Sequence, residues 1–199
     1  MEEILNLLGH DLSGSVSIRA FYPSTDPRSG EPGAARDKTT TLSDAQSLAA
    51  QWSAEGRSIY VMPNGPGKAD ADIKQCRALF YEHDDCPKAE SQILWESLGL
   101  PQPSFQVDTG GKSIHSYWVL SEPIPSATWR MAIADLIVFA NSDRYCKNPS
   151  RIMRCPGYPH PETGVDAQII NASDLRYDFE TLRALIPSQP VEARSPRKP

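Results

Sequence analysis

The chain has 199 residues, 39% of them hydrophobic, and a formal net charge of −5 at pH 7. This length suits one full-sized domain or two small lobes that share a cleft, and the acidic balance argues mildly against a general nucleic-acid binder, because such domains are usually basic. No apolar run reaches the roughly 18 residues that a membrane span needs, and the opening Met-Glu-Glu-Ile-Leu is unlike a secretory signal. We therefore expect a cytoplasmic protein.

Helices and strands alternate along the first half of the chain. Apolar side chains alternate with small or polar ones over 16–22, Pro23 ends that run, and Ser43 is placed to cap a helix. A turn rich in proline and glycine at 63–67 ends the next alternating run. In chain order, the predicted elements are a helix over 4–8, a strand over 16–22, a long loop over 23–37, a helix over 44–54, and strands over 58–62 and 78–83.

One hairpin stands out in the second half, where two strands flank a turn at 109–112. The predicted elements are a helix over 88–98, strands over 105–108 and 114–120, a helix over 126–140, a short strand over 152–154 and a helix over 177–185. The pattern predicts an α+β fold with a mixed, mostly antiparallel sheet. It predicts one domain over 1–186, followed over 187–199 by a linker that would lead to a further domain.

Acidic residues gather where the strand predicted over 78–83 ends. Side chains two apart on a strand share a face, so Glu82 and Asp84 are expected to point the same way. Neighbouring carboxylates repel each other unless a cation lies between them, and hard oxygen ligands suit Mg²⁺ or Mn²⁺. A solvated acidic strand end is the alternative, and Asp85 leaves open which pair binds metal.

The hairpin carries a second group of chemically useful residues. Gly110 and Gly111 let backbone amides approach an anion closely, and Lys112 adds positive charge. Ser113 and His115 share one strand face, where a histidine beside a triphosphate can donate a hydrogen bond to it. The stretch is not a Walker loop, because its glycine spacing is wrong and no helix follows. A plain turn with a packed histidine is the alternative.

A third group lies near residue 150. Asp143 offers another carboxylate, and the guanidinium forks of Arg151 and Arg154 suit phosphate oxygens. The alternative is that these arginines cover the surface and pair with the excess acid of the chain.

The four cysteines show no Cys-x-x-Cys spacing, which indicates reduced thiols instead of a disulfide scaffold. A zinc site built from Cys146, Cys155 and His160 is a minor alternative, because the spacing of these residues is irregular.

Taken in order, these motifs resemble those of the archaeo-eukaryotic primase superfamily, in particular the primase-polymerases of phages and plasmids, and they look closest to enzymes of cyanobacterial phages. That family carries an acid-x-acid strand, a Ser-x-His motif, a third acid and an Arg-x-x-Arg-x-Pro-Gly segment. The matching residues here are Glu82-His83-Asp84, Ser113-Ile114-His115, Asp143 and Arg151-Ile152-Met153-Arg154-Cys155-Pro156-Gly157. Glu82 stands where many members carry Asp, so Asp84 is expected to be the firmer ligand.

The resemblance implies an RRM-like catalytic core plus a small N-terminal α/β subdomain, with a cleft between them. It implies template-directed nucleotidyl transfer with two Mg²⁺ or Mn²⁺ ions held by Glu82, Asp84 and Asp143. Nucleotide-binding residues would be Lys112, Ser113, His115, Arg151, Arg154 and, from its position in the 63–67 turn, Asn64. Expected partners are a DNA template and primer, nucleoside triphosphates and a helicase domain or protein, in the cytosol of a phage host or bacterium.

Other functions stay open. A metal-dependent nuclease or replication initiator usually needs paired histidines and a nucleophilic tyrosine, and His115 has no His-x-His partner. An RRM-like nucleic-acid-binding module would present aromatic side chains to stack on bases, but Tyr117 and Trp118 are adjacent, so only one faces any given side. An inactive structural domain would take up no metal.

Overall fold

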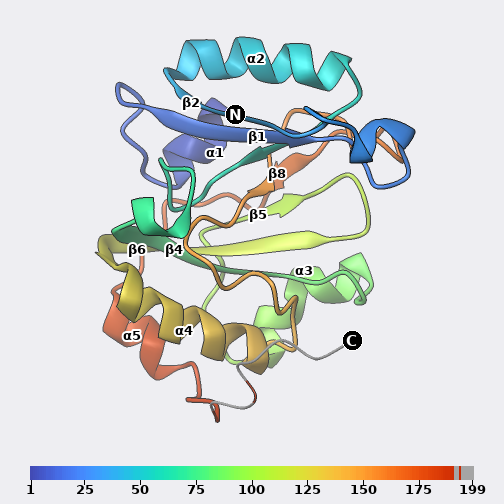
Figure 1. Ribbon diagram of the computed structural model, residues 1–199. Helices are drawn as coiled ribbons and strands as arrows, with labels where there is room; N and C mark the ends of the chain where they lie inside the picture. The colour runs from blue at the N-terminus through green and yellow to red at the C-terminus, as the bar shows by residue number, and fades with distance from the viewer. Residues whose placement is uncertain (191–192, 194–199) are drawn as a thin grey trace.

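The computed structural model describes residues 1–190 and Ala193, which fold into two antiparallel sheets of four strands each, with helices on their outer sides (Figure 1). The first sheet has the strand order β2-β1-β3-β7. Its strands are β1 (Val16–Phe21), β2 (Arg36–Thr40), β3 (Ser58–Val61) and β7 (Met153–Arg154). Three of these strands come from the N-terminal part of the chain, and β7 returns from much later to pair with β3.

The second sheet has the order β4-β6-β5-β8 and lies at the centre of the molecule. Its strands are β4 (Gln75–Glu82), β5 (Phe105–Asp108), β6 (Ile114–Pro125) and β8 (Gln168–Ile170). The predicted hairpin is confirmed as β5 and β6, with Asp108 opposite Ile114. On the other side of β6, Glu82 at the end of β4 lies opposite His115.

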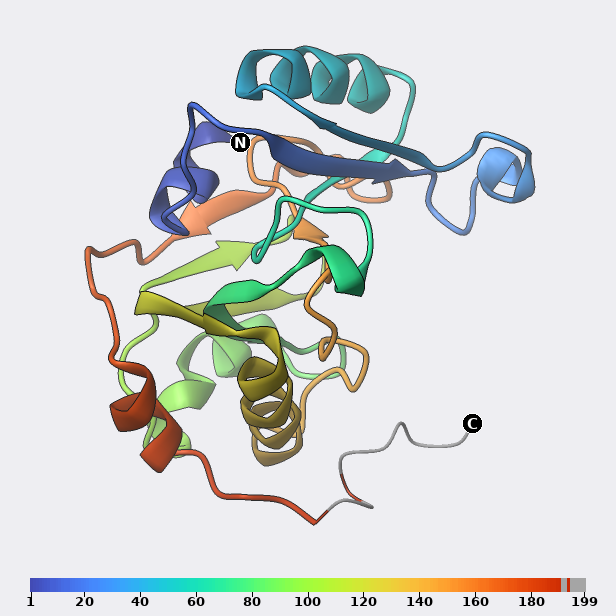
Figure 2. The same ribbon diagram turned by 60° about the vertical axis from the view of Figure 1, so that its left-hand side comes forward.

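Helices cover the outer faces of the two sheets, as Figures 1 and 2 show. The helix α2 packs on the first sheet, and α3, α4 and α5 lie on the far side of the second sheet. The helices are α1 (Glu2–Leu7), α2 (Leu42–Ala54), α3 (Lys88–Ser97), α4 (Ser126–Phe139) and α5 (Phe179–Ala184), with 3₁₀ turns at Pro27–Gly30 and Asp70–Asp72. Large buried side chains such as Trp118, Trp129 and Tyr81 fill the core around the second sheet.

The sheet prediction needs correction in two respects. The α+β class is confirmed, but the strands form two sheets instead of one, and every ladder between named strands is antiparallel. The strands β2 and β8 were not predicted. β2 reads Arg-Asp-Lys-Thr-Thr and is largely exposed at a sheet edge, so it lacks the alternating apolar residues that indicate a half-buried strand.

The structure describes residues 187–190 of the predicted linker, and the division into domain and linker stays a prediction. Ile186 is buried, and the backbone N–H of Gln189 donates to Asp135 Oδ1 on α4 at 3.0 Å. The remainder of that prediction falls on 191–192 and 194–199, which lie outside the described residues. None of the described helices combines the length and the apolar character that crossing a bilayer requires.

Candidate active site

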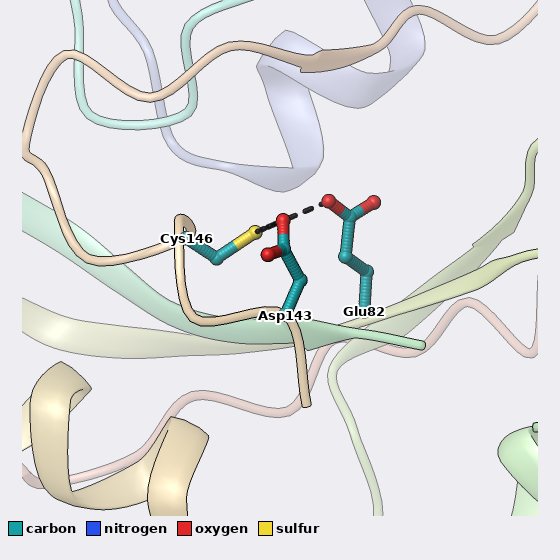
Figure 3. A group of neighbouring side chains, drawn as sticks. All are labelled: Glu82, Asp143 and Cys146. Atoms are coloured by element: carbon teal, nitrogen blue, oxygen red, sulfur yellow. Dashed lines mark hydrogen bonds between the residues drawn. The ribbon is translucent and has the colours of Figure 1, made fainter. Parts of the chain in front are cut away.

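Two carboxylates and one thiol meet at the end of β4. Glu82 is the last residue of that strand, and the backbone N–H of Asp143 donates to Glu82 O at 3.1 Å. Asn141, with φ of 50°, turns the chain after α4, so that Asp143 comes back to the strand end. The ligand atoms of Glu82, Asp143 and Cys146 all lie within 4.8 Å of one another. Figure 3 shows the Cys146 sulfur pointing at the carboxylate oxygens.

Basic side chains lie against this cluster. His115 Nε2 lies 2.7 Å from Glu82 Oε2, and Arg151 Nη2 lies 2.9 Å from Asp143 Oδ2 and 3.3 Å from Glu82 Oε1. Burial alone would raise the pKa of Glu82, but the charge and hydrogen bond of His115, the Cys146 thiol and Arg151 outweigh it and hold that pKa well below its usual range. Glu82 is therefore an anion at neutral pH.

The thiol of Cys146 belongs to the same network. Its Sγ lies 3.2 Å from Glu82 Oε1 and 3.6 Å from Asp143 Oδ2, and the one thiol hydrogen is shared between these two acceptors. Burial, followed by the charge of Glu82, raises the pKa of this thiol well above its usual value. It is a neutral hydrogen-bond donor beside the carboxyl groups of Glu82 and Asp143.

Asp84 stands apart from this cluster. β4 ends at Glu82, so the strand alternation used in the prediction does not extend to Asp84. Its Oδ1 accepts a hydrogen bond from Ser113 Oγ at 2.5 Å and lies 3.9 Å from Lys112 Nζ. The structure thus places Glu82, and not Asp84, at the centre of the acidic group with Asp143. Asp85 lines a second pocket, which Asp84 and Asp143 also line.

A pocket of about 710 Å³ opens beside Glu82 and is lined from both sheets. Most of the predicted site residues meet there. The pocket is lined by Phe21, Tyr60, Glu82, Asp84, Thr109, Gly111, Lys112, Ser113, His115, Arg151, Ile152, Met153, Arg154, His160, Glu162 and Thr163. Cationic, hydroxyl and imidazole groups thus line one pocket together with carboxylates, which suits an anionic ligand that carries divalent cations.

The glycines of the hairpin serve close packing. Gly110 has φ of +73°, and a Cβ there would collide with the backbone of Val165. A Cβ on Gly111 would lie 2.6 Å from His160 Nε2. The segment around 160–165 therefore rests directly on the hairpin, and Thr163 Oγ1 donates to Gly110 O at 2.7 Å.

Several residues of the pocket escaped the sequence prediction. His160 was considered only as a zinc ligand, and Phe21 and Tyr60 were not singled out. Tyr60 lies 4.8 Å below the guanidinium of Arg154 and packs edge-on against Phe21. In the sequence, only the Arg-x-x-Arg spacing pointed to this side of the pocket. Tyr60 could not be predicted, because the pairing of β7 with β3 is what brings Arg154 onto it.

Two predictions on individual residues are not supported. Among the described residues, Cys146, Cys155 and His160 do not gather into a metal-binding group, so the zinc alternative is wrong. Asn64 is buried and lines neither pocket, and its Oδ1 accepts from the backbone N–H groups of Arg77 and Ala78 at 2.8 and 3.2 Å. This buried position suits a residue that stabilises β4 better than one that contacts a nucleotide.

The aromatic residues of the second sheet argue against a base-stacking module. Tyr117 is fully buried and stacks on Phe105, with ring centroids 4.5 Å apart. Trp118 is also buried, and its Nε1 donates to Pro101 O at 2.8 Å. Neither ring presents a free face for a base.

The donor set fits a divalent cation. Two carboxylates supply hard oxygen ligands, and a positively charged nitrogen of Arg151 already lies on an oxygen of each. These oxygens are thus arranged to share one positive charge.

Comparisons with known proteins place this architecture. No family model matches the chain, and no curated protein matches it. Among solved structures, the AEP domain of the cyanophage S-2L primase-polymerase is 37% identical, with a TM-score of 0.79 over 92% of this chain and 94% of that chain. The catalytic domain of primase RepB′ in complex with initiator DNA is 12% identical with a TM-score of 0.64, and the polymerase domain of Mycobacterium tuberculosis ligase D in complex with DNA is 16% identical with a TM-score of 0.50. The last two show likeness of fold alone.

Proposed function

Because this chain belongs to the archaeo-eukaryotic primase superfamily and is a nucleotidyltransferase of the primase-polymerase type, we propose that it joins nucleotides on a DNA template by a metal-dependent phosphoryl transfer. The observation that carries this proposal is the meeting of Glu82 and Asp143, remote in sequence, beside a pocket lined by Lys112 and Arg154. Nucleotidyl transfer requires carboxylates that bind metal ions and, near them, cationic side chains that bind phosphate groups.

Glu82 and Asp143 would hold one Mg²⁺ or Mn²⁺ ion, and Asp84, exposed at the pocket, would help to hold a second. When bound, such ions supply charge that lowers the pKa of an attacking 3′-hydroxyl and stabilises the pyrophosphate leaving group. The protein fixes its ligands beforehand. His115 orients Glu82 through their 2.7 Å contact, and Ser113 orients Asp84.

Other side chains would bind the nucleotide. Lys112 is 66% exposed at the pocket, so its ammonium group is free to approach a phosphate. Arg154 lies over Tyr60, which fixes its guanidinium within reach of the same space. We propose that the first sheet with α2 forms a small subdomain, and that the pocket lies in the cleft between this subdomain and the RRM-like core.

DNA is the proposed template and primer, and nucleoside triphosphates are the proposed substrates. Support for DNA comes from the likeness of fold to RepB′ and the ligase D polymerase domain, both of which have structures in complex with DNA. A helicase partner stays a prediction.

The test is extension of a labelled primer on a DNA template with Mn²⁺ or Mg²⁺. We expect Glu82→Gln and Asp143→Asn each to lower the rate by roughly 100-fold or more, because each removes charge from the proposed metal site. Asp84→Ala should also lower the rate. Glu122→Gln is the matched control, since Glu122 is an exposed acid on β6 that lines neither pocket.

Full activity of Glu82→Gln or activity in excess EDTA would contradict this function. Nicking of supercoiled DNA without nucleotides would favour the nuclease alternative instead.

A further inference from the structure

Arg151 occupies the place where a cation would share the carboxylates. One nitrogen of its guanidinium, Nη2, contacts both Asp143 Oδ2 at 2.9 Å and Glu82 Oε1 at 3.3 Å. Both residues belong to the group whose ligand atoms lie within 4.8 Å of one another. The arginine therefore takes up lone pairs that a divalent ion needs.

Loss of a proton cannot release Arg151 from the two carboxylates, because the guanidinium of arginine stays protonated in proteins. A divalent ion bound to the same oxygens would also lie against a positive charge of the protein, which is unfavourable. Binding of the ion by Glu82 and Asp143 thus requires the Arg151 side chain to move.

The surroundings of Arg151 allow that movement. Its side chain is 26% exposed and lines the pocket, so open space lies on one side of it. Its Nε is buried and finds no hydrogen-bond partner among the described residues. The guanidinium is thus incompletely satisfied on the carboxylates, and an anion in the pocket would offer it the missing acceptors.

We propose that Arg151 exchanges partners during the binding of substrate: it pairs with Glu82 and Asp143 first, and it moves to the triphosphate once a divalent ion takes those carboxylates. This inference rests on the proposed function. The exchange makes metal and nucleotide binding cooperative, because the group that opposes the metal becomes a ligand of the nucleotide. By linkage, each ligand then raises the affinity for the other by the same factor.

The experiment measures Mn²⁺ binding to the full chain from the electron paramagnetic resonance signal of free Mn²⁺. Binding is measured with and without a non-hydrolysable nucleoside triphosphate. We expect Arg151→Gln to bind Mn²⁺ alone about tenfold more tightly than the wild type, with the gain in affinity caused by the nucleotide reduced by a similar factor. Arg151→Met, which also lacks the charge, should behave in the same way.

Arg154→Gln is the matched control, because Arg154 lines the same pocket but contacts Tyr60 instead of the carboxylates. It should weaken nucleotide binding and leave Mn²⁺ binding in the absence of nucleotide within about threefold of the wild type. An equal gain in Mn²⁺ affinity in Arg154→Gln and Arg151→Gln would overturn the exchange, because it would show a general effect of removing positive charge from the pocket.

A measurement on the wild type keeps the inference testable if the Arg151 variants do not fold. Titration with Mg²⁺ should shift the nuclear magnetic resonance signal of the Arg151 Nε–H, and an unchanged signal at saturation would overturn the exchange.

The same data separate this inference from the proposed function. If the wild type and Glu82→Gln bind Mn²⁺ equally weakly, both proposals fail. If Glu82→Gln loses Mn²⁺ binding while Arg151→Gln matches the wild type, only the exchange is wrong.

Discussion

Cys146 shows how much a single residue depends on its setting. The sequence indicated a reduced thiol, with a zinc site shared with Cys155 and His160 as a minor alternative. The structure instead buries its Sγ against Glu82 Oε1 and Asp143 Oδ2, at 3.2 and 3.6 Å. A soft thiol thus lies beside two hard carboxylates, a mixed donor set that favours thiophilic ions more than carboxylates alone would.

We expect Cd²⁺ to bind at this cluster and to give an ultraviolet charge-transfer band between sulfur and cadmium. Cys146→Ser should abolish the band and lower Cd²⁺ affinity by about tenfold or more, while Mg²⁺ affinity changes by less than about threefold. Cys86→Ser is the control and should keep the band, because Cys86 lies outside the metal-binding group. A band that survives in Cys146→Ser would show that another thiol binds the ion.

Individual residues were predictable where chain order carries the signal. The order of Glu82, His115, Asp143 and Arg151 in the sequence singled out side chains that the fold brings into contact. The contacts themselves were not predictable. His115 meets Glu82 because β6 pairs with β4 in one particular register, and that register depends on the packing of the whole sheet.

At the scale of one element, the pairing of β4 with β6 is irregular at one point, and the Asn64 side chain binds the backbone of β4 there. The register between β4 and β6 shifts between Cys76 and Ala78. Asn64 Oδ1 accepts from the N–H groups of Arg77 and Ala78, and Trp129 Nε1 donates to Ala78 O at 2.7 Å. Side chains therefore satisfy backbone groups that a bulge leaves unpaired.

Asn64→Ala is expected to lower the free energy of unfolding by about 1–3 kcal/mol, because it leaves buried N–H groups without an acceptor. The KM for nucleotide should not change, because Asn64 lines neither pocket. Urea unfolding and primer extension measure the two quantities. Asn6→Ala, an exposed asparagine of α1, is the control for stability. A raised KM with unchanged stability would restore the predicted role of Asn64 in nucleotide binding.

Elements with strong apolar patterns were predicted well, and those without were missed. The helix predicted over 126–140 is confirmed as α4, which is largely buried. β2 and β8 are short and lie at sheet edges, where few side chains are buried. Their positions depend on backbone pairing with a neighbour, which leaves little trace in the local sequence.

At the scale of the whole molecule, the division of the strands into two sheets could not be predicted from local sequence patterns, and only the family resemblance implied a separate N-terminal subdomain. β3 and β4 follow each other in the chain but belong to different sheets, and β7 returns to the first sheet after the second is largely built. This return places Arg151 and Arg154 between the two sheets, where they line the pocket. Such pairings are non-local, and period and propensity report only on local structure.

His10 joins the N-terminal segment to the turn between the two sheets. Its ring is buried, and Nε2 lies 3.0 Å from Pro63 O. Burial, and then the charge of Arg77, lowers the pKa of His10 from 6.5 to about 4. The folded protein therefore holds His10 neutral at pH values where the unfolded chain binds a proton.

This difference predicts a loss of stability in acid. The contribution of neutral His10 is fully present above pH 6.5 and is lost as the pH falls toward 4, because only the unfolded chain takes up the proton over that range. Relative to His10→Gln, which has no titrating ring, the wild type should lose about 1.4 kcal/mol per pH unit, or roughly 3 kcal/mol in all. Urea unfolding of both proteins between about pH 7.5 and pH 4 measures this difference. The contributions of the carboxylates cancel, because both proteins share them. Parallel stability curves would mean that His10 titrates alike in the folded and unfolded chain, and that its burial against Pro63 does not resist protonation.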